Sequence, residues 1–457
     1  MAPRGTSVVR INLTHTLELL QTHISAALCR TVFATVRTTE RQRQWTLEAL
    51  VRFWLAVILR APRALSHALA EARAGTDPLV PRVTATPEAF FKRCRDLRPA
   101  FFAAVFAQFT ARLVAATPAR YAADLAPLQA RFSAVLVVDG SRLAAIAHRL
   151  KLLWEERAVI LPGCLLAVYD LGRGLCRDLV FDPDAAAAEL PRAQALLAQL
   201  PGGALLVGDR LYGAAVWFAA LGAHGLWGVT RRNRRLGLRT LRRLSRRAHA
   251  GGRLEEWLVA AGSGVSAPVQ TLRYIRWRQG RITHELLTNV LEPQQLAAAE
   301  ALALYPRRWR IERMYFDLKA VLNLNRVYAA NPNAVAMQVF AAGCVYNALR
   351  VAQAEVATVA RVAPEAIAPA KLFPKVAAAC AAAAFFELGV LATQRLNPGR
   401  RVRRPTLSRQ PFVTVALDAI LVEPRTGARR RRRFCPARRR WKSLVRVRGA
   451  RRRLKLS

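Results

Sequence analysis

Hydrophobic residues recur at helical spacing in the first 130 residues and then give way to short apolar runs. The helical spacing is clearest in one segment, where large apolar residues alternate with polar ones at Leu47, Leu50, Val51, Phe53, Trp54, Val57 and Leu59. Pro62 and Pro78 interrupt this pattern and separate helices. We therefore expect residues 1–130 to be helical, with no strand before Phe132.

From Phe132 onward, runs rich in β-branched residues predict buried strands. These expected strands cover residues 133–139, 164–170, 175–181, 203–209 and 226–230. Helical periodicity lies between them, over residues 184–200 and 213–223. The order is strand, two-stranded hairpin, helix, strand, helix, strand. This order predicts a mixed α/β core whose first part is residues 131–232.

The rest of the chain divides by its pattern into four further regions. Strands expected over 254–259, 269–278 and 282–290 make residues 233–298 a β-rich insertion. Helices over 293–304 and 306–324 begin the second part of the core, residues 299–350. An Ala-rich helical pattern from Val335 to Phe386 leads into a C-terminal helical region, 351–424. Residues 425–457 contain no acid and three runs of Arg, so we expect a basic, disordered tail.

The large positive net charge of the chain indicates what kind of molecule it binds. The 457 residues carry 72 Lys and Arg against 29 Asp and Glu, a net charge of +43. Drift of a GC-rich coding sequence toward Ala and Arg accounts for part of this excess, and the remainder indicates a polyanion such as nucleic acid. The seven cysteines form no C-x-x-C pair, which argues against a disulfide framework or a zinc site. With no signal-peptide layout and no uninterrupted span of about 20 apolar residues, we expect a cytoplasmic, nucleoid-associated protein without membrane contact.

Two acids, Asp139 and Asp209, each end an expected buried strand. Neighbouring strands lie about 5 Å apart, so both carboxylates can reach one point. Buried like charges this close are unfavourable without a cation between them, and Mg²⁺ prefers oxygen ligands. Two such ions can clamp the attacking and leaving oxygens in phosphodiester chemistry. A single Asp at a strand end is more often a turn or helix cap, and this alternative stays open.

A third element strengthens the case for phosphate chemistry. Tyr305, Arg308, Glu312 and Lys319 lie on one expected helix, and at about 100° per residue they share one face. Glu312 would supply a third carboxylate, while Arg308 and Lys319 could hold phosphates on either side of it. The alternative is an amphipathic helix with Glu–Arg pairs on a solvated face.

The spacing Tyr-x2-Arg-x3-Glu-x6-Lys, found in full at residues 305–319, resembles the signature of IS4-type DDE transposases of bacterial insertion sequences. Asp139-Gly-Ser141 resembles the family's first-acid motif, and Gly208-Asp209-Arg-Leu-Tyr212 resembles its second. Leu286-Leu-Thr-Asn289 is similar to the strand before the glutamate helix. The resemblance runs from about Val135 to Leu349. It departs at Leu211, where the family often has a small residue.

The resemblance implies an RNase H-like core with a β-rich insertion. It implies that Asp139, Asp209 and Glu312 are catalytic and hold two Mg²⁺ ions, with Mn²⁺ able to substitute. Tyr305, Arg308 and Lys319 would contact DNA. The activity implied is cleavage at inverted-repeat ends and strand transfer into target DNA, by a homodimer on double-stranded DNA.

The same resemblance suggests further DNA contacts. Arg210, beside the second acid, would touch phosphate or form a structural ion pair. Trp277 is our first candidate, and Trp257 our second, for an aromatic that stacks a flipped base; cross-strand packing is the alternative for both. We expect Trp309 to pack beneath the signature helix. The N-terminal helices would recognise the inverted repeats.

Two other classes of protein remain open. The first is an RNase H-like nuclease or a host-adopted, inactive transposase that keeps the same site. The second is a basic nucleic-acid binding protein without catalysis, which would explain the charge but leave the acidic motifs as coincidence.

Overall fold

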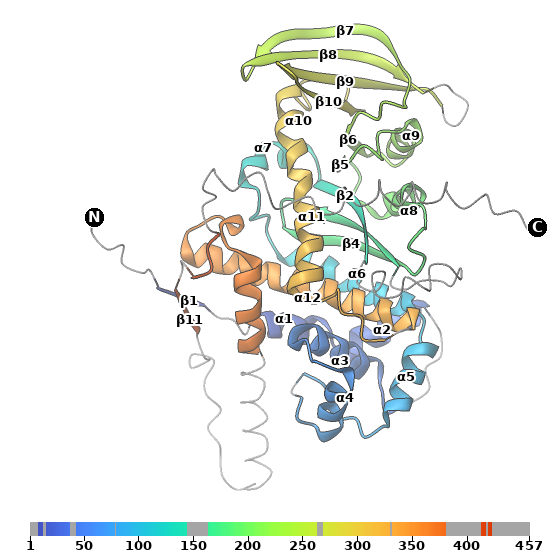
Figure 1. Cartoon of the computed structure of the whole chain (residues 1–457), viewed down its shortest axis with the longest axis vertical. Helices are drawn as coiled ribbons and strands as arrows, with labels where there is room; N and C mark the ends of the chain where they lie inside the picture. Colours follow the sequence, from blue (N-terminus) through green and yellow to red (C-terminus); the bar gives the residue numbers. More distant parts are fainter. Residues whose placement is uncertain are drawn as a thin grey trace, which may run out of the picture. The chain divides into compact units, whose positions relative to one another are not determined.

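One nine-stranded sheet dominates the computed structural model (Figure 1). The structure describes residues 8–11, 15–36, 43–77, 79–143, 163–262, 268–329, 331–380, 413–416 and 419–422. The strand order is β4-β3-β2-β5-β6-β10-β9-β8-β7. The strands are β2 (Val135–Arg142), β3 (Cys164–Asp170), β4 (Leu175–Asp182), β5 (Leu205–Gly208), β6 (Trp227–Arg231), β7 (Leu238–His249), β8 (Gly252–Ala261), β9 (Gln270–Gln279) and β10 (Ile282–Thr288).

The first five of these strands form the core. β2 lies in the middle, with the antiparallel hairpin β3–β4 on one side and the parallel strands β5 and β6 on the other. This is the RNase H-like arrangement, so the predicted mixed α/β fold class is confirmed. β2 extends three residues beyond Asp139, whereas we expected the strand to end there. Its pairing with β5 stops at Val137, and from there β2 pairs with β3 alone.

Alternate residues of the core strands face two separate hydrophobic clusters. Val135 and Val137 belong to the cluster that includes residues of α6 (Pro99–Ala116), α11 (Trp309–Phe316) and α12 (Pro332–Ala360). Leu136 and Val138 belong to the cluster beneath α8 (Glu189–Leu196), the short 3₁₀ turn η2 (Leu197–Gln199) and α9 (Ala215–Ala223). This alternation is the period of two that a strand buried on both faces requires.

The N-terminal region is helical, as predicted, except for one strand. Its helices are α1 (His15–His23), α2 (Ala26–Val36), α3 (Leu47–Arg60), α4 (Leu65–Ala74), α5 (Pro87–Asp96), α6 (Pro99–Ala116), the 3₁₀ turn η1 (Ala123–Leu125) and α7 (Ala126–Arg131). β1 (Val8–Ile11) pairs antiparallel with β11 (Val413–Ala416), so the expectation of no early strand is wrong. The strand is only four residues long and its partner lies about 400 residues later in the sequence, so no local pattern predicts it.

A long helix, α12 (Pro332–Ala360), crosses the centre of the structure. Asn331 begins it by accepting hydrogen bonds from Asn333 and Ala334, and Arg361 ends it in the left-handed conformation, with φ 53°. The helix expected from Val335 to Phe386 is therefore interrupted, because Pro364 then starts the short 3₁₀ turn η5 (Pro364–Ala366). Residues 369–380 are helical again. The predicted basic tail, 425–457, lies outside the described residues.

Two described helices, α6 and α12, are long and apolar enough to cross a membrane by length and composition. The most apolar stretch of α12 is completely buried inside the structure, and 39% of that of α6 is buried. Burial of this kind is typical of a core helix of a folded domain.

The signature segment winds in three different ways. Helix α10 (Ala298–Leu304) leads into a 3₁₀ turn, η3 (Tyr305–Arg308), then the α-helix α11 (Trp309–Phe316) and a π-helical turn, η4 (Asp317–Val321). We predicted helices from 293 and from 306 to 324, so the first begins later and the second is not uniform. Pro306 lacks the N–H that a continuing α-helix would use, which fits the tighter turn there. In Figure 1, α10 and α11 run along one face of the sheet.

The insertion adds β7–β10 to the core sheet, because β10 pairs antiparallel with β6. Sequence reasoning found β8, β9 and β10 but missed β7. That strand contains five arginines, which hide the alternation that strand prediction depends on: Arg239, Arg242, Arg243, Arg246 and Arg247.

Candidate functional site

The three predicted acids line one cavity of about 540 Å³. Asp139 comes from β2, Asp209 follows β5, and Glu312 comes from α11. The parallel pairing of β2 with β5 brings the two aspartates to the same end of the sheet. The residues around the cavity are Asp139, Gly140, Ser141, Asp209, Arg308, Glu312, Tyr315, Phe316 and Lys319.

Asp139 is more enclosed than Glu312, with 16% of its side chain exposed against 36%. Its pKa is raised to about 7, with burial as the main cause; the charges of Glu189 and Asp209 contribute to the rise, while Arg308 and a hydrogen bond from the Gly140 N–H oppose it. A carboxyl group whose pKa lies near neutral pH is costly to ionise in this environment. A nearby cation would stabilise the ionised form, so the site is suited to binding one.

Arg308 supplies positive charge to two of the acids. Its Nη1 lies 3.1 Å from Asp139 Oδ2, and its Nη2 lies 2.7 Å from Glu312 Oε1. The guanidinium therefore bridges β2 and α11, and 12% of the side chain is exposed. Both acids raise the pKa of Arg308, so it stays charged.

Asp209 has a different environment. Its Oδ1 accepts a hydrogen bond of 2.6 Å from the Leu211 N–H, which closes the turn after β5. The Leu211 side chain is 44% exposed, so the turn holds this large residue without burying it. Among the described residues, no Lys or Arg forms an ion pair with Asp209. Its carboxylate is thus the less neutralised of the two aspartates.

Lys319 and Tyr315 hold the end of β2 against the signature segment. Lys319 Nζ donates to Ser141 Oγ and to the Arg142 carbonyl, both at 2.6 Å, and burial lowers its pKa to about 8. The Tyr315 hydroxyl donates to the Asp139 carbonyl at 2.7 Å. Despite the changes in helix winding, Arg308, Glu312 and Lys319 all face the same cavity.

The remaining predicted DNA contacts lie outside the set that lines the cavity. Tyr305 is beside Arg308 and within electrostatic range of Asp209, and burial raises its pKa. Arg210 is exposed, and within the described part of the chain it forms no ion pair. The structure therefore shows no structural ion pair for Arg210.

The insertion tryptophans take part in cross-strand packing. Trp277 Nε1 donates to the His249 carbonyl at 2.9 Å, and its ring stacks on His284. The Trp257 ring stacks on Tyr274, and Arg276 covers it at 4.8 Å. Neither ring reaches the cavity of the acids, so a role in base stacking stays a prediction.

Trp309 is not the packing anchor that we expected. It is 63% exposed, with the Arg308 guanidinium 5.2 Å from the centre of its ring. The residue is the first of α11, immediately after the 3₁₀ turn.

The residues present suit a hard cation in their chemistry but do not form a closed cage for one. Carboxylate oxygens are the ligands Mg²⁺ prefers, and Asp139, Asp209 and Glu312 share one cavity. Within the described residues, no three His, Cys, Asp or Glu side chains come close enough to form a metal group. Arg308 lies between Asp139 and Glu312, where it occupies the space between the two carboxylates.

Sequence reasoning missed two residues next to the site. Tyr315 is three positions after Glu312, so helical spacing could have placed both on one face. Glu189 begins α8 and lies against Gly140, on the opposite side of β2 from α11. Its position within a longer expected helix, 184–200, gave no sign of this.

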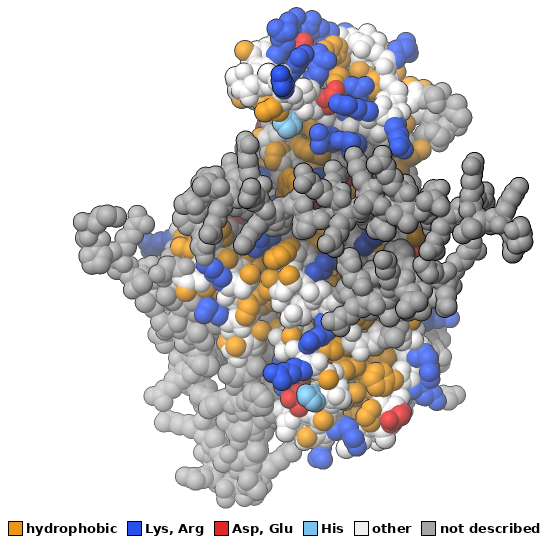
Figure 2. All heavy atoms as spheres, in the orientation of Figure 1, with side chains coloured by type: hydrophobic (Ala, Val, Ile, Leu, Met, Phe, Trp, Pro, Cys, Tyr) orange, Lys and Arg blue, Asp and Glu red, His pale blue; other side chains and the backbone are white. Residues whose placement is uncertain are grey.

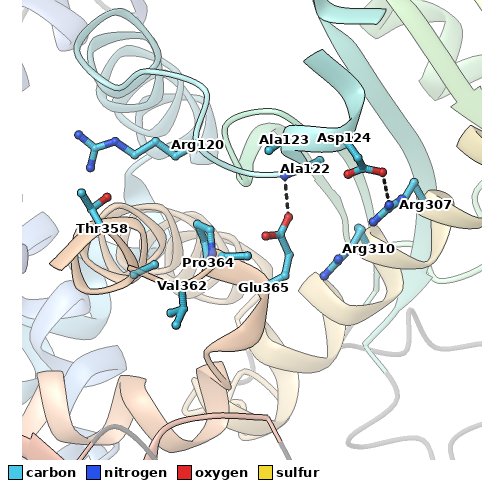
Figure 3. A pocket seen from close by; sticks show the side chains of 12 residues that line it. Arg120, Ala122, Ala123, Asp124, Arg307, Arg310, Thr358, Val362, Pro364 and Glu365 are labelled. Atoms are coloured by element: carbon cyan, nitrogen blue, oxygen red, sulfur yellow. Dashed lines mark hydrogen bonds and ion pairs between the residues drawn. The ribbon is translucent and has the colours of Figure 1, made fainter. Parts of the chain in front are cut away.

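A second cavity, of about 580 Å³, lies on another side of the signature segment (Figure 3). Arg307 and Arg310 line it, and Glu365 points toward its centre and accepts a 2.7 Å hydrogen bond from the Ala122 N–H. Arg307 forms an ion pair with Asp124. Both acids of this cavity are thus already bonded to the protein, and the cavity shares no lining residue with the one around Asp139.

Fold and cavity together define an RNase H-like protein with an acidic site at the end of its central strand. The family model described as Transposase DDE domain matches residues 162–348. That region includes Asp209 and Glu312, while Asp139 lies upstream of it. The chain is thus similar to transposases over the later strands of the core, the insertion and the signature helix.

A curated relative shows the same similarity. Over 197 residues the chain is 29% identical to a protein of Sinorhizobium fredii (strain NBRC 101917 / NGR234) provisionally named transposase y4zB; this is 39% of the chain and 54% of the relative. The chain thus spans about half the length of the curated relative it matches. Among solved structures, a piggyBac transposase synaptic complex with hairpin DNA aligns over 88% of this chain and 86% of its own, with a TM-score of 0.36 and 9% identity. A TM-score this low does not establish a common fold.

Proposed function

We propose that this chain is an IS4-type DDE transposase that cuts the inverted-repeat ends of an insertion sequence and joins them to target DNA. The observation that carries the proposal is the shared cavity of Asp139, Asp209 and Glu312, with Arg308 and Lys319 beside them. The match of residues 162–348 to the Transposase DDE domain supports the same activity.

Divalent metal ions bound by the three carboxylates would activate the attacking oxygen and stabilise the leaving oxygen. Mg²⁺ suits the all-oxygen donor set, and Mn²⁺ would substitute. Because Arg308 spans Asp139 and Glu312, we expect its guanidinium to give up at least one of these contacts when cations enter.

The cationic side chains would then bind the substrate. A freed Arg308 guanidinium can hold two phosphate oxygens at once, whereas the Lys319 ammonium acts as a point charge. Lys319 also keeps Ser141 and Arg142 in place, so it fixes the strand that carries Asp139. Tyr305, which lies near Asp209, and the exposed Arg210, which follows Asp209 in the chain, would extend phosphate contact beyond the cavity.

The insertion supports binding to a polyanion. Figure 2 shows Lys and Arg side chains gathered over β7–β10. Between residues 233 and 290 the sequence has twelve Arg and three Glu, a local charge of +9. Arginines of the insertion exceed the acids available to pair with them, because Arg243 and Arg246 of β7 and Arg276 of β9 all surround Glu255. Such an excess gives affinity for phosphate that falls steeply as salt rises.

A cleavage assay on matched DNA tests the proposal. The DNA on both sides of the gene is sequenced first, and any short inverted repeats are built into labelled duplexes. We expect strand cleavage at the repeat ends with Mg²⁺ or Mn²⁺ and none with EDTA. Asp209→Ala and Glu312→Ala should abolish cleavage while DNA binding persists. Asp96→Asn, which removes an exposed carboxylate on α5, serves as the matched control and should cleave normally.

Three results would redirect the assignment. If Asp209→Ala nicks its ends at the wild-type rate, the acids do not perform the reaction. Cleavage of RNA–DNA hybrids in preference to repeat ends would indicate an RNase H-like nuclease. DNA binding without metal-dependent cleavage would indicate a non-catalytic binding protein or an inactive, domesticated copy. A homodimer on paired ends is expected because two ends must be joined.

A further inference from the structure

Glu189 is a carboxylate that no sequence motif marked and that lies directly against the acidic site. It is the first residue of α8, on the side of β2 opposite α11. A Cβ added to Gly140 would stand 2.3 Å from Glu189 Oε2, so the carboxylate fills the space that glycine leaves free. Gly140 directly follows Asp139 on β2, and successive residues of a strand face opposite sides of the sheet. Asp139 and Glu189 therefore lie on opposite faces of the same strand.

The strand edge beside these residues is open. β2 pairs with β5 only as far as Val137, and the chain of β5 turns away at Asp209. Around Asp139 and Gly140 the edge toward β5 therefore carries no ladder. Carboxylates from both faces of the sheet can approach each other around such an edge, which a continuous sheet would prevent.

Tyr212 holds Glu189 in this position. The Tyr212 side chain is fully buried, and its hydroxyl donates to Glu189 Oε1 at 2.6 Å. Its ring packs against Gly208, where an added Cβ would lie 2.8 Å away. One carboxylate is thus connected both to the strand of Asp139 and to the turn that carries Asp209.

Glu189 also lacks a cation. The neighbouring Arg192 donates to the Ala187 and Ala188 carbonyls and to Cys164 Sγ, and its ion pair is with Asp182. In the part of the chain that the structure describes, no Lys or Arg forms an ion pair with Glu189. A partly buried carboxylate is ordinarily paired, so the absence of an ion pair among the described residues leaves the charge of Glu189 open to a cation.

We propose that Glu189 is a fourth carboxylate of the metal site, approaching the cation from the α8 side of β2 while Asp139, Asp209 and Glu312 approach from the α11 side. The inference deepens the proposed function and depends on it. Its chemical basis is that a cation placed at the open edge would relieve the repulsion among Asp139, Asp209 and Glu189.

Binding of Mn²⁺ to the full chain, without DNA, tests this assignment by calorimetry. We expect Glu189→Gln to weaken Mn²⁺ binding by about tenfold or more, the range typical when a group at a metal site is removed. Gly140→Ala should produce the same loss, because its Cβ displaces the end of a flexible side chain and not backbone. Asp182→Asn is the matched control, since it removes one nearby carboxylate that already pairs with Arg192, and it should bind Mn²⁺ normally.

Thermal unfolding of each variant separates metal binding from a structural role. If Glu189→Gln and Gly140→Ala lower the melting temperature but bind Mn²⁺ as the wild type does, Glu189 is only a structural partner of Tyr212 and the proposal fails. Asp139→Asn and Asp209→Asn test the site itself. If Asp139→Asn and Asp209→Asn keep wild-type affinity for Mn²⁺, the proposed metal site is wrong. If they lose Mn²⁺ binding while Glu189→Gln and Gly140→Ala keep it, the metal site is supported but Glu189 is not one of its ligands.

Discussion

Replacing Asp139 by Asn should make the metal-free protein more stable at alkaline pH. The carboxyl group has an ordinary pKa of 3.8 and a pKa of about 7 in the fold, where burial is the main cause of the rise. Below pH 3.8 both the folded and the unfolded chain hold the proton. As the pH rises toward 7 the unfolded chain loses it first, so stability falls through this window and stays lower above it.

The size of this effect follows from the shift of about three pKa units between 3.8 and about 7. Each unit corresponds to 1.36 kcal/mol, so ionised Asp139 costs the metal-free fold about 4 kcal/mol. Asn is a neutral isostere that does not ionise, and it should recover most of this free energy at pH 8. The gain should shrink toward zero near pH 4, where Asp139 is neutral in both states.

Urea unfolding followed by tryptophan fluorescence, in EDTA, measures the difference between Asp139→Asn and wild type at pH 4, 6 and 8. Added Mg²⁺ should stabilise the wild type more than the variant, because the metal would favour ionised Asp139. Equal or lower stability of the variant at pH 8 in EDTA would refute the reasoning, as would a difference that does not change with pH.

Three further predictions concern the scaffold. Arg350→Met should cost about 3 kcal/mol or more, because the buried guanidinium donates to three acceptors that would lose their partner, and a urea midpoint equal to wild type would contradict this. Gly343→Ala should destabilise by about 1–3 kcal/mol although Ala favours helices, since its Cβ would stand 2.8 Å from the Phe106 ring; a stabilised variant would show that α6 and α12 can separate without cost. Trp309→Ala should change stability by no more than about 0.5 kcal/mol because the side chain is 63% exposed, and a loss of several kcal/mol would restore the packing role that the structure rejects.

The core strands could be predicted from the sequence because burial on both faces leaves continuous apolar runs. Residues 133–139 and 203–209 show such runs, and the order of elements then limits the topology. The edge strand β7 follows the opposite rule. An exposed strand needs no apolar residues. Because β7 is rich in arginine, it lacks the hydrophobic alternation from which strands are predicted, and its sequence is typical of a loop.

The candidate site was predictable to the extent that it depends on local spacing. Arg308, Glu312 and Lys319 share a face under ideal helical geometry, and they still line one cavity although the segment contains a 3₁₀ turn and a π-helical turn. The exposure of Trp309 could not be predicted, because a large aromatic residue in a helix is ordinarily expected to pack against the core. Glu189 depends on tertiary contact across the sheet, between residues 49 positions apart in the sequence.

Because the sheet is continuous from β2 to β7, the distance between the acidic site and the outer edge of the insertion is fixed. Six strand-to-strand steps separate the strand of Asp139 from the arginine-rich edge, in the order β2-β5-β6-β10-β9-β8-β7. At about 4.8 Å a step this distance is roughly 29 Å along the sheet, before twist shortens it. Hydrogen-bonded ladders resist stretching, so the spacing cannot adjust to the ligand as a hinged domain would. On the proposed DNA substrate this distance would correspond to roughly eight base pairs at about 3.4 Å each. The site of cleavage and the phosphates bound by the β7 arginines would then be a fixed number of base pairs apart.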